Sequence, residues 1–363
     1  MKYLSEYRDE VLVNEYVKVL HKITTKPWSI MEICGGQTHG LVKNGILEML
    51  PSLITMVHGP GCPVCVTSPS IIDDAITLAE KSNVILCSFG DMLRVPGTRK
   101  SLLEAKATGL DIRILYSPLE AVEIAKKNPD KEVVFFAVGF ETTAPANALS
   151  IVQADKMKIE NYSILASHVL VPPAMEALLS DADNNINAFL AAGHVCAIMG
   201  VDEYYPIAEK YKLPIIVTGF EPVDLLQGIY MAISQLEKGK HFVENQYLRS
   251  VRQEGNLIAK ETLHQVFDVV DRDWRGIGMI GQSGFEVNSR YKAYNARIKF
   301  GLAETTLPEH SICISGEIMK GRKKPFDCAA FGKTCRPESP IGAPMVSSEG
   351  ACAAYYHYQS QTN

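Results

Sequence analysis

The sequence lacks blocks of basic residues, long apolar runs and a leader-like N-terminus. Its 36 Lys and Arg residues are scattered among 41 Asp and Glu residues, so the net charge is −5, and a chain without a basic patch is a poor match for nucleic acid. No apolar run reaches the roughly 18 residues that a membrane-spanning helix needs. The first residues are charged and contain no apolar signal core. We therefore expect a cytoplasmic protein that binds neither nucleic acid nor membrane.

Phosphate-binding motifs are also missing. The segment CGGQTHG (34–40) lacks GxGxxG spacing, and GPGCPVC (59–65) lacks the Lys-Ser/Thr ending of a P-loop. The chain does hold nine cysteines, and a reducing compartment does not allow these to be interpreted as a disulfide framework. Metal binding or thiol chemistry should therefore explain any cysteine cluster.

Short apolar runs that end in glycine or a small polar residue alternate with amphipathic stretches. The predicted strands are 29–34, 53–59, 83–90, 111–117, 132–140, 162–168, 194–200 and 214–220. Predicted helices between and after them include 39–50, 70–82, 118–128, 222–239 and 244–270. Strands joined by helical crossovers predict an α/β protein with parallel, doubly wound sheets of Rossmann-like or thioredoxin-like type.

Eight strands and 363 residues fit two α/β domains with four strands in each sheet, plus a third unit. We place the first domain at 17–130 and the second at 131–240. A weak internal repeat, VGFETTAP (138–145) and TGFEPVDL (218–225), is compatible with duplication. The third unit, 1–16 with 241–363, is expected to consist of helices and loops rich in Gly, Pro and Cys.

Two unusual segments directly follow the first two predicted strands: CGGQTHG (34–40) and HGPGCPVC (58–65). Loops at the carboxyl ends of parallel strands line the ligand crevice of such sheets. If the two strands are neighbours, one rim gathers a set of sulfur and imidazole side chains: Cys34, His39, His58, Cys62 and Cys65.

Cys34 is the first candidate in this group. Gly35 and Gly36 allow the backbone to approach a ligand or to take a positive φ, and Thr38 is expected to be the N-cap of the helix 39–50. The start of a helix favours thiolate at Cys34. The alternative is a strand-end cysteine packed as a small apolar side chain, but the neighbouring sulfurs and histidines favour function.

Cys62 and Cys65 have the spacing of a thioredoxin-type dithiol, stiffened by Pro60 and Pro63. The next helix is expected to begin near residue 68 or 70, after the pair. Half of a zinc site and an inert turn are the alternatives. The zinc interpretation lacks a second CxxC or HxxxH, so the pattern favours redox or substrate-metal chemistry.

Four more cysteines lie in the C-terminal region at spacings that match no common zinc finger: Cys313, Cys328, Cys335 and Cys352. Four thiolates in a Gly- and Pro-rich segment suit either an iron-sulfur cluster or zinc, and spacing alone leaves both open. Ser347 or Ser348 is expected to cap the final helix, with Cys352 in its first turn.

The remaining chemistry-bearing residues have simpler interpretations. Cys87 and Cys196 lie in apolar runs and are expected to be inert core residues. Glu141 and Glu221 follow Gly-Phe at strand ends, where a carboxylate holds either a ligand or the N–H groups of a helix start, and we favour the second. His168 and His194 are expected to be hydrogen-bonded strand-end histidines.

Taken together, the motifs CGGQTH, GPGCPVC, GFETTAP, SHVLVPPAM and MVSSEGACAAYY resemble the HypD family of hydrogenase maturation proteins along nearly the whole chain. The resemblance implies two α/β domains of related architecture plus a domain carrying a [4Fe-4S] cluster. It also implies a scaffold, formed with the small chaperone HypC, on which the Fe(CN)2CO unit of [NiFe]-hydrogenase is built with cyanide from HypE. We therefore expect an assembly scaffold with thiol-redox and electron-transfer activity rather than a conventional enzyme.

The resemblance also assigns residues. It makes Cys34 the holder of the iron with His39 nearby, Cys62 and Cys65 a redox pair, and the four C-terminal cysteines the cluster ligands. By analogy with ferredoxin-thioredoxin reductase, the cluster would exchange electrons with the pair. Residues in supporting positions are Gly35, Gly36, Thr38, His58, Glu141, Thr142 and Glu221.

Two departures from the family pattern stand out. The segment CVTP reads CVTSP here, which moves the proline to Pro69, and some relatives have a cysteine where this chain has Pro344. The alternative function is a cluster-dependent protein disulfide reductase, which needs Cys62 and Cys65 but not Cys34. A third possible function is that of a zinc-stabilised interaction module.

Overall fold

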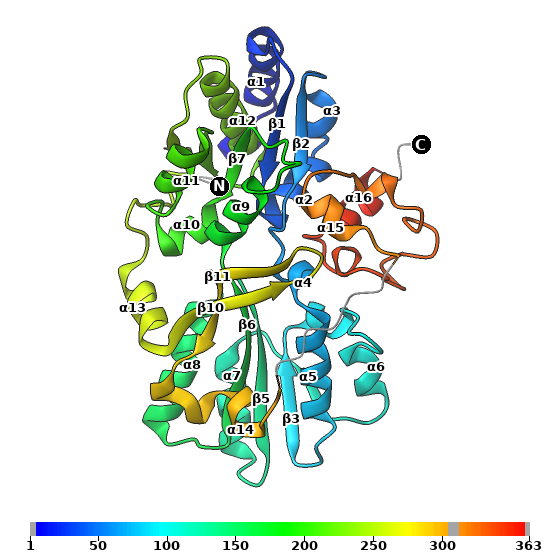
Figure 1. Cartoon of the computed structure of the whole chain (residues 1–363), viewed down its shortest axis with the longest axis vertical. Helices are drawn as coiled ribbons and strands as arrows, with labels where there is room; N and C mark the ends of the chain where they lie inside the picture. Colours follow the sequence, from blue (N-terminus) through cyan, green and yellow to red (C-terminus); the bar gives the residue numbers. More distant parts are fainter. Residues whose placement is uncertain (1–4, 304–311, 360–363) are drawn as a thin grey trace.

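A computed structural model describes residues 5–303 and 312–359. It contains two β-sheets in two lobes, with the C-terminal region packed beside them (Figure 1). The upper lobe in Figure 1 holds a five-stranded parallel sheet of order β2-β1-β7-β8-β9. Its strands are β1 (Trp28–Glu32), β2 (Ile54–His58), β7 (Ala188–Ala192), β8 (Ile215–Thr218) and β9 (Val243–Asn245).

Helices cover both faces of this sheet, as a parallel sheet requires. One face packs against α9 (Val171–Leu179), α10 (Gly193–Met199) and α11 (Tyr204–Tyr211). The other packs against α1 (Glu10–Ile23), α2 (Gly35–Lys43), α3 (Ile46–Met49) and α12 (Pro222–Leu236), and η1 (Ser5–Arg8) precedes α1. The central strands β7 and β8 are therefore buried at every residue.

The lower lobe holds a six-stranded mixed sheet of order β10-β11-β6-β5-β3-β4. Its parallel strands are β3 (Val84–Ser88), β4 (Ile112–Ile114), β5 (Glu132–Gly139) and β6 (Tyr162–Val169). The antiparallel hairpin β10 (Phe267–Trp274) and β11 (Gly278–Val287) extends it beside β6. The surrounding helices are α5 (Pro69–Ala79), η2 (Gly90–Arg94), α6 (Leu102–Ala107), α7 (Pro118–Lys127), α8 (Ala144–Met157), α13 (Leu257–Val266), η3 (Ser289–Tyr294) and α14 (Ala296–Phe300).

The C-terminal region lies beside α2 and α4, where Figure 1 draws it in orange and red. Its elements are α15 (Ser315–Met319), η4 (Pro325–Asp327), η5 (Ala343–Met345) and α16 (Ala351–Tyr358). The short helix α4 (Pro63–Val66) belongs to the earlier part of the chain and follows β2. The C-terminal region has a small apolar core of its own, which includes Cys335 and Cys352. Nowhere in the described ranges is a helix both long and apolar enough to cross a membrane.

The α/β class and the presence of two sheets confirm the sequence prediction, and seven of the eight predicted strands are present. The run 194–200 is the exception, because it forms helix α10 and the strand is the preceding β7. Gly193 permits this early turn: a Cβ there would lie 2.4 Å from the Thr218 oxygen. The predicted helix 244–270 is also wrong, since only α13 is helical and β9 and β10 occupy its ends.

The sheets do not follow the predicted boundaries. Strand β3 pairs with β5, so β3 and β4 share one sheet with β5 and β6, and residue 130 does not separate one sheet from the other. The boundary at 16/17 falls inside α1, which packs against α12 of the upper lobe. The hairpin 267–287 belongs to the lower sheet, so the prediction that 241–363 forms only helices and loops is wrong as well.

Candidate functional site

Strands β1 and β2 are neighbours, as the rim prediction required. They pair in parallel with Glu32 opposite His58, so the segments CGGQTHG and GPGCPVC leave the sheet at the same edge. Cys34, Cys62 and Cys65 share one apolar core cluster, and all three are at most 4% exposed. The adjacency of these two motifs is therefore confirmed.

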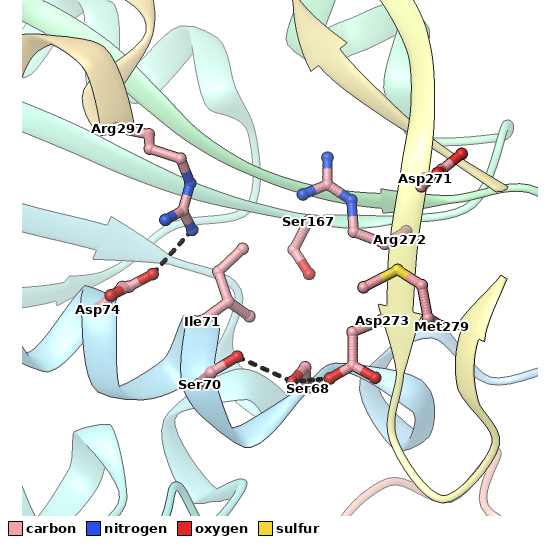
Figure 2. A pocket seen from close by; sticks show the side chains of 10 residues that line it. All are labelled: Ser68, Ser70, Ile71, Asp74, Ser167, Asp271, Arg272, Asp273, Met279 and Arg297. Atoms are coloured by element: carbon pink, nitrogen blue, oxygen red, sulfur yellow. Dashed lines mark hydrogen bonds and ion pairs between the residues drawn. The ribbon is translucent and has the colours of Figure 1, made fainter. Parts of the chain in front are cut away.

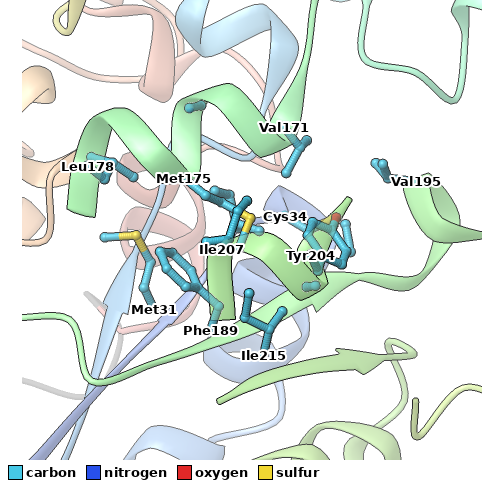
Figure 3. Packing of buried hydrophobic residues seen from close by; sticks show 14 of the residues in the cluster. Met31, Cys34, Val171, Met175, Leu178, Phe189, Val195, Tyr204, Ile207 and Ile215 are labelled. Atoms are coloured by element: carbon cyan, nitrogen blue, oxygen red, sulfur yellow. The ribbon is translucent and has the colours of Figure 1, made fainter. Parts of the chain in front are cut away.

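Cys34 is the N-cap of α2, and its Sγ lies 3.7 Å from Nδ1 of His194. Figure 3 shows its side chain within the cluster formed by the upper sheet and the helices α9 and α11. Phe220 packs against the His194 ring with 5.2 Å between the ring centroids. The residue that contacts the Cys34 sulfur is thus His194, which the sequence predicted to be an ordinary strand-end histidine.

The electrostatics of Cys34 differ from the expectation. Burial raises the pKa of its thiol, and the nearby carboxylate of Glu349 raises that pKa further, which outweighs the opposite effect of the backbone N–H groups at the start of α2. Burial lowers the pKa of His194 to about 4, so its imidazole is neutral at pH 7. Cys34 is therefore a neutral thiol beside the neutral imidazole of His194. A bound cation would favour loss of the thiol proton.

Gly35 and Gly36 lie next to Cys34 and allow three other chain segments, at Gly61, Phe220 and Glu349, to approach it closely. The N–H of Gly35 donates to the Gly61 oxygen at 2.8 Å. A Cβ on Gly35 would lie 2.4 Å from the Glu349 oxygen, and a Cβ on Gly36 would lie 3.2 Å from the Phe220 ring. Both glycines thus leave room for other parts of the protein, a backbone carbonyl and an aromatic ring. Neither takes the positive φ that was one of the two expectations.

Gly61 makes the tightest of these approaches, and we expect Gly61→Ala to destabilise the protein. An added Cβ would lie 2.2 Å from the Cys34 nitrogen and 2.3 Å from the carbonyl carbon of Ile33, both backbone atoms that cannot rotate away. The expected loss of unfolding free energy is about 3 kcal/mol, measured by urea unfolding. Gly90→Ala is the matched control because its Cβ would have only an ordinary contact at 3.6 Å; equal stability of the two variants would contradict the account.

Cys62 and Cys65 form a disulfide with their Cα atoms 5.2 Å apart. Cys62 is the N-cap of the short helix α4, and its sulfur accepts from the Cys65 N–H at 3.3 Å. Helix α4, which begins at this cysteine pair, was not predicted. The sequence predicted α5 to be the first helix after β2. That helix does begin at Pro69, where the shifted proline suits its first position.

The hairpin and the C-terminal region hold α4 from two sides. The Arg275 N–H donates to the Val66 oxygen at 2.8 Å, and Thr67 pairs with Trp274 as an isolated bridge. On the other side α4 contacts η5, and Val64 packs against the core that contains Ala343. The segment that carries the Cys62–Cys65 pair is thus in contact with both the hairpin and the C-terminal region.

The four C-terminal cysteines lie close enough to influence one another. Burial raises the pKa of Cys352, and charge on the other three, Cys313, Cys328 and Cys335, raises that pKa further. A Cβ on Gly342 would lie 2.2 Å from Cys313 Sγ, so the absence of a side chain at Gly342 leaves room for this sulfur where it lies. Within the residues that the structure describes, no group of three or more His, Cys, Asp or Glu side chains could hold a single metal ion.

The cap predictions near these sites are wrong. Thr38 lies inside α2, not at its start, and its hydroxyl donates to Glu32. The N-cap of α16 is Gly350, so neither Ser347 nor Ser348 caps it, although Cys352 does fall in its first turn. In both cases the helix boundary differs by a few residues from the sequence prediction.

His39 and His58 lie at the rim but their contacts differ. His39 is half-buried, with Nδ1 3.2 Å from the Ser348 oxygen and its ring edge-on to Tyr358. His58 is buried and bonds to Glu32 and to Tyr355. Both histidines therefore connect the upper sheet to the C-terminal region.

Glu141 and Glu221 both serve helix starts, as favoured. Glu141 Oε1 accepts from the N–H of Val171, the first residue of α9, at 2.8 Å. Glu221 is the N-cap of α12 and pairs with Arg8 at 2.9 Å. Thr142 lies half-buried in the turn between β5 and α8.

Glu141 should make stability depend on pH. Burial raises its pKa to about 8, whereas an unfolded Glu titrates near 4.3. Between these values the folded state binds more protons than the unfolded state, so stability falls as pH rises from about 4 to 8. We expect Glu141→Gln to flatten that fall in melting temperature, and exposed Glu123→Gln on α7 to leave it intact; unchanged pH dependence in Glu141→Gln would contradict this.

The remaining cysteine and histidine predictions are confirmed. Cys87 is buried in β3, and Cys196 is buried, although in helix α10 rather than a strand. His168 is buried at the end of β6, and Asn147 donates to its Nε2 at 2.8 Å. Burial lowers the pKa of His168 to about 3, which keeps it neutral.

A cavity of about 280 Å³ lies behind α4, between the start of α5, β6 and the hairpin (Figure 2). Ser68 donates to Asp273 at 2.7 Å and Arg297 pairs with Asp74 at 2.7 Å across its walls. None of the predicted site residues lines it. These bonds attach α5 to the hairpin and to α14.

Fold and site together define a thiol-rich α/β protein, in which a buried cysteine, a disulfide and a four-cysteine region adjoin. A family model named HypD and described as the hydrogenase formation HypA family matches residues 11–359. The chain is 45% identical to the hydrogenase maturation factor HypD2 of Bradyrhizobium diazoefficiens, covering 99% of this chain and 97% of the relative. It is 42% identical to the hydrogenase maturation factor HypD of Escherichia coli K12, covering 99% of both.

The chain belongs to the HypD family of hydrogenase maturation factors. The resemblance inferred from the motifs is thereby confirmed.

Proposed function

We propose that this chain, together with a small HypC-type chaperone, is the scaffold on which the Fe(CN)2CO unit of [NiFe]-hydrogenase is assembled, with cyanide supplied by a HypE-type partner. The observation that carries the proposal is the meeting of Cys34 with His194 at 3.7 Å beside the Cys62–Cys65 pair. The iron unit is the cargo of this site, and it leaves with the next protein. The chain acts as a scaffold rather than as a conventional enzyme.

Cys34 is the proposed ligand of the cargo iron. Iron that carries cyanide and carbonyl is electron-rich, and a soft thiolate suits it. Burial disfavours a free thiolate at Cys34, so the anion would form only when the metal arrives, with release of a proton. Neutral His194 offers a second donor from α10, and His39 remains a proposed participant on α2.

The four C-terminal cysteines are the proposed ligands of a [4Fe-4S] cluster. Their mutual influence on the pKa of Cys352, and the small apolar core around Cys335 and Cys352, support a shared buried group. When bound, such a cluster supplies single electrons at a potential that the protein sets. With Pro344 in place of the cysteine of some relatives, the four cysteines form the complete set.

Cys62 and Cys65 are the proposed redox switch. Reduction breaks their S–S bond, takes up two electrons and two protons, and creates two thiols beside Cys34; the disulfide offers no thiolate. The packing of α4 against η5 supports exchange of electrons with the C-terminal region. A switch of this kind would raise or lower the affinity of the site for the cargo iron.

The ratio of iron to acid-labile sulfide tests the proposal. A [4Fe-4S] cluster holds equal amounts of both, whereas the cargo iron brings no sulfide. The anaerobic complex with the chaperone should therefore contain more iron than sulfide, and the chain expressed alone should contain equal amounts. Equal amounts in the complex would overturn the proposed iron site.

A protein disulfide reductase is the second candidate, favoured by the disulfide itself. It would use Cys62 and Cys65 and the cluster but not Cys34. Turnover of a protein disulfide that survives Cys34→Ala would favour it over the scaffold.

A further inference from the structure

A buried hydrogen-bond chain connects the Cys34 turn to helix α16. It begins at Glu32, the fully buried last residue of β1. The Glu32 carboxylate accepts from the Cys34 N–H at 3.2 Å and from the Thr38 hydroxyl. It therefore fixes the first and the fifth residue of the segment 34–38, which forms the N-cap and first turn of α2. It also bonds to His58 Nδ1 at 2.6 Å.

The chain continues through His58 to Tyr355. The β1–β2 register places His58 directly beside Glu32, and His58 Nε2 lies 2.8 Å from the Tyr355 hydroxyl. When the Glu32 carboxylate is ionised it only accepts, so a neutral His58 then donates from Nδ1 and accepts at Nε2 from the tyrosine hydroxyl. The hydrogen bonds therefore run without a break from the Tyr355 hydroxyl to the Cys34 N–H.

Tyr355 is anchored in the C-terminal region. It lies on α16 three residues after Cys352, and it is 2% exposed. Its ring packs edge-on against Phe326, which precedes Cys328 by two residues and packs in turn against Phe331. The tyrosine thus packs through its ring beside the segment that precedes Cys328, and its hydroxyl bonds to the Glu32 network.

We infer that Glu32, His58 and Tyr355 are positioning residues that fasten the Cys34 turn to the cysteine-bearing C-terminal region. Through them, the packing of α16 sets how readily the turn opens and exposes the Cys34 sulfur. This inference concerns the protein without cargo and does not require the cluster. If the proposed cluster is present, its assembly around Cys352 would change the packing of α16. Through the same hydrogen bonds it would then change how readily the Cys34 turn opens.

The test is the alkylation rate of Cys34 in the full-length chain expressed without partners. Cys34 is only 2% exposed, so iodoacetamide must wait for the turn to open. Tyr355→Phe keeps the ring and removes the hydroxyl, and we expect about five-fold faster alkylation, the factor that corresponds to one hydrogen bond of about 1 kcal/mol. Mass spectrometry of the Cys34 peptide gives the rate.

Tyr162→Phe is the matched control. It also removes a buried tyrosine hydroxyl, bonded to Ser150 at 2.8 Å, but in the lower lobe. It should lower thermal stability similarly and leave alkylation of Cys34 unchanged. Equal effects of the two variants on Cys34, or no effect of Tyr355→Phe, would overturn the inference. Deuterium exchange at the turn 34–38 provides a second readout, and faster exchange in Tyr355→Phe alone is expected.

Discussion

Replacing Cys328 with alanine is expected to remove nearly all iron and acid-labile sulfide from the anaerobically purified chain and to abolish its broad visible absorption. Each thiolate of a [4Fe-4S] cluster holds one iron, so losing one of the four opens the cluster to solvent and exchange. The C-terminal region has only a small core of its own, and a lost cluster should therefore also lower its thermal transition. Metal and sulfide analysis beside the visible spectrum measures the effect.

Cys87→Ala is the control for this experiment. Cys87 is a fully buried cysteine in β3, packed in the lower lobe rather than in the C-terminal region. Its variant should keep its iron, sulfide and colour. Wild-type iron and sulfide in Cys328→Ala would exclude this residue as a ligand, and colourless wild-type protein containing zinc would favour the interaction-module alternative.

Cys34→Ala has the second large effect. In the complex with the small chaperone, this variant is expected to lose all iron in excess of sulfide, because the proposed thiolate ligand of the cargo is gone. The proposed cluster ligands are other residues, Cys313, Cys328, Cys335 and Cys352, so the cluster iron and sulfide should remain. Iron and sulfide analysis of the purified complex measures both at once.

Cys196→Ala provides the matched control for Cys34→Ala. Cys196 is buried in the same apolar cluster, on α10, and its sulfur lies 3.8 Å from the Tyr204 hydroxyl. The control should retain the excess iron despite a similar loss of packing. Loss of the excess in both variants would indicate a general packing effect rather than a ligand role for Cys34.

The sequence could predict the rim because its determinants are local. Apolar runs identify β1 and β2, and glycine and proline after each run mark where the strand ends. Parallel strands present their carboxyl ends at one edge, so adjacency of β1 and β2 was enough to bring Cys34 to the Cys62–Cys65 pair. The strand pairing in the structure supplies that adjacency.

His194 was missed because its strand was placed too late in the sequence. The run HVCAIM contains Val and Ile and reads as a strand, whereas the true strand β7 is AFLAA, with weak β-propensity. Since β7 pairs with β1, a strand ending at Ala192 would have put His194 at the same edge as Cys34. An alanine-rich segment forms a strand here because the neighbouring strands pair with it. The local sequence pattern does not predict such pairing.

The sheet membership could not be predicted either. Pairing of β3 with β5, and of β11 with β6, joins segments far apart in the chain. Local periodicity identifies strands but not their partners, because pairing depends on packing across the whole lobe. The hydrogen bonds from Glu32 through His58 to Tyr355 are also of this kind, because the Tyr355 hydroxyl reaches His58 only when α16 packs against the upper lobe at α2.

The infrared spectrum of the anaerobic complex with the chaperone tests the central claim most directly, with wild type measured beside Cys34→Ala. The account predicts bands from iron-bound cyanide and carbonyl in the wild-type complex and none in the variant. The same bands in both proteins would contradict the assignment of the cargo iron to Cys34, and with it the function proposed for this site.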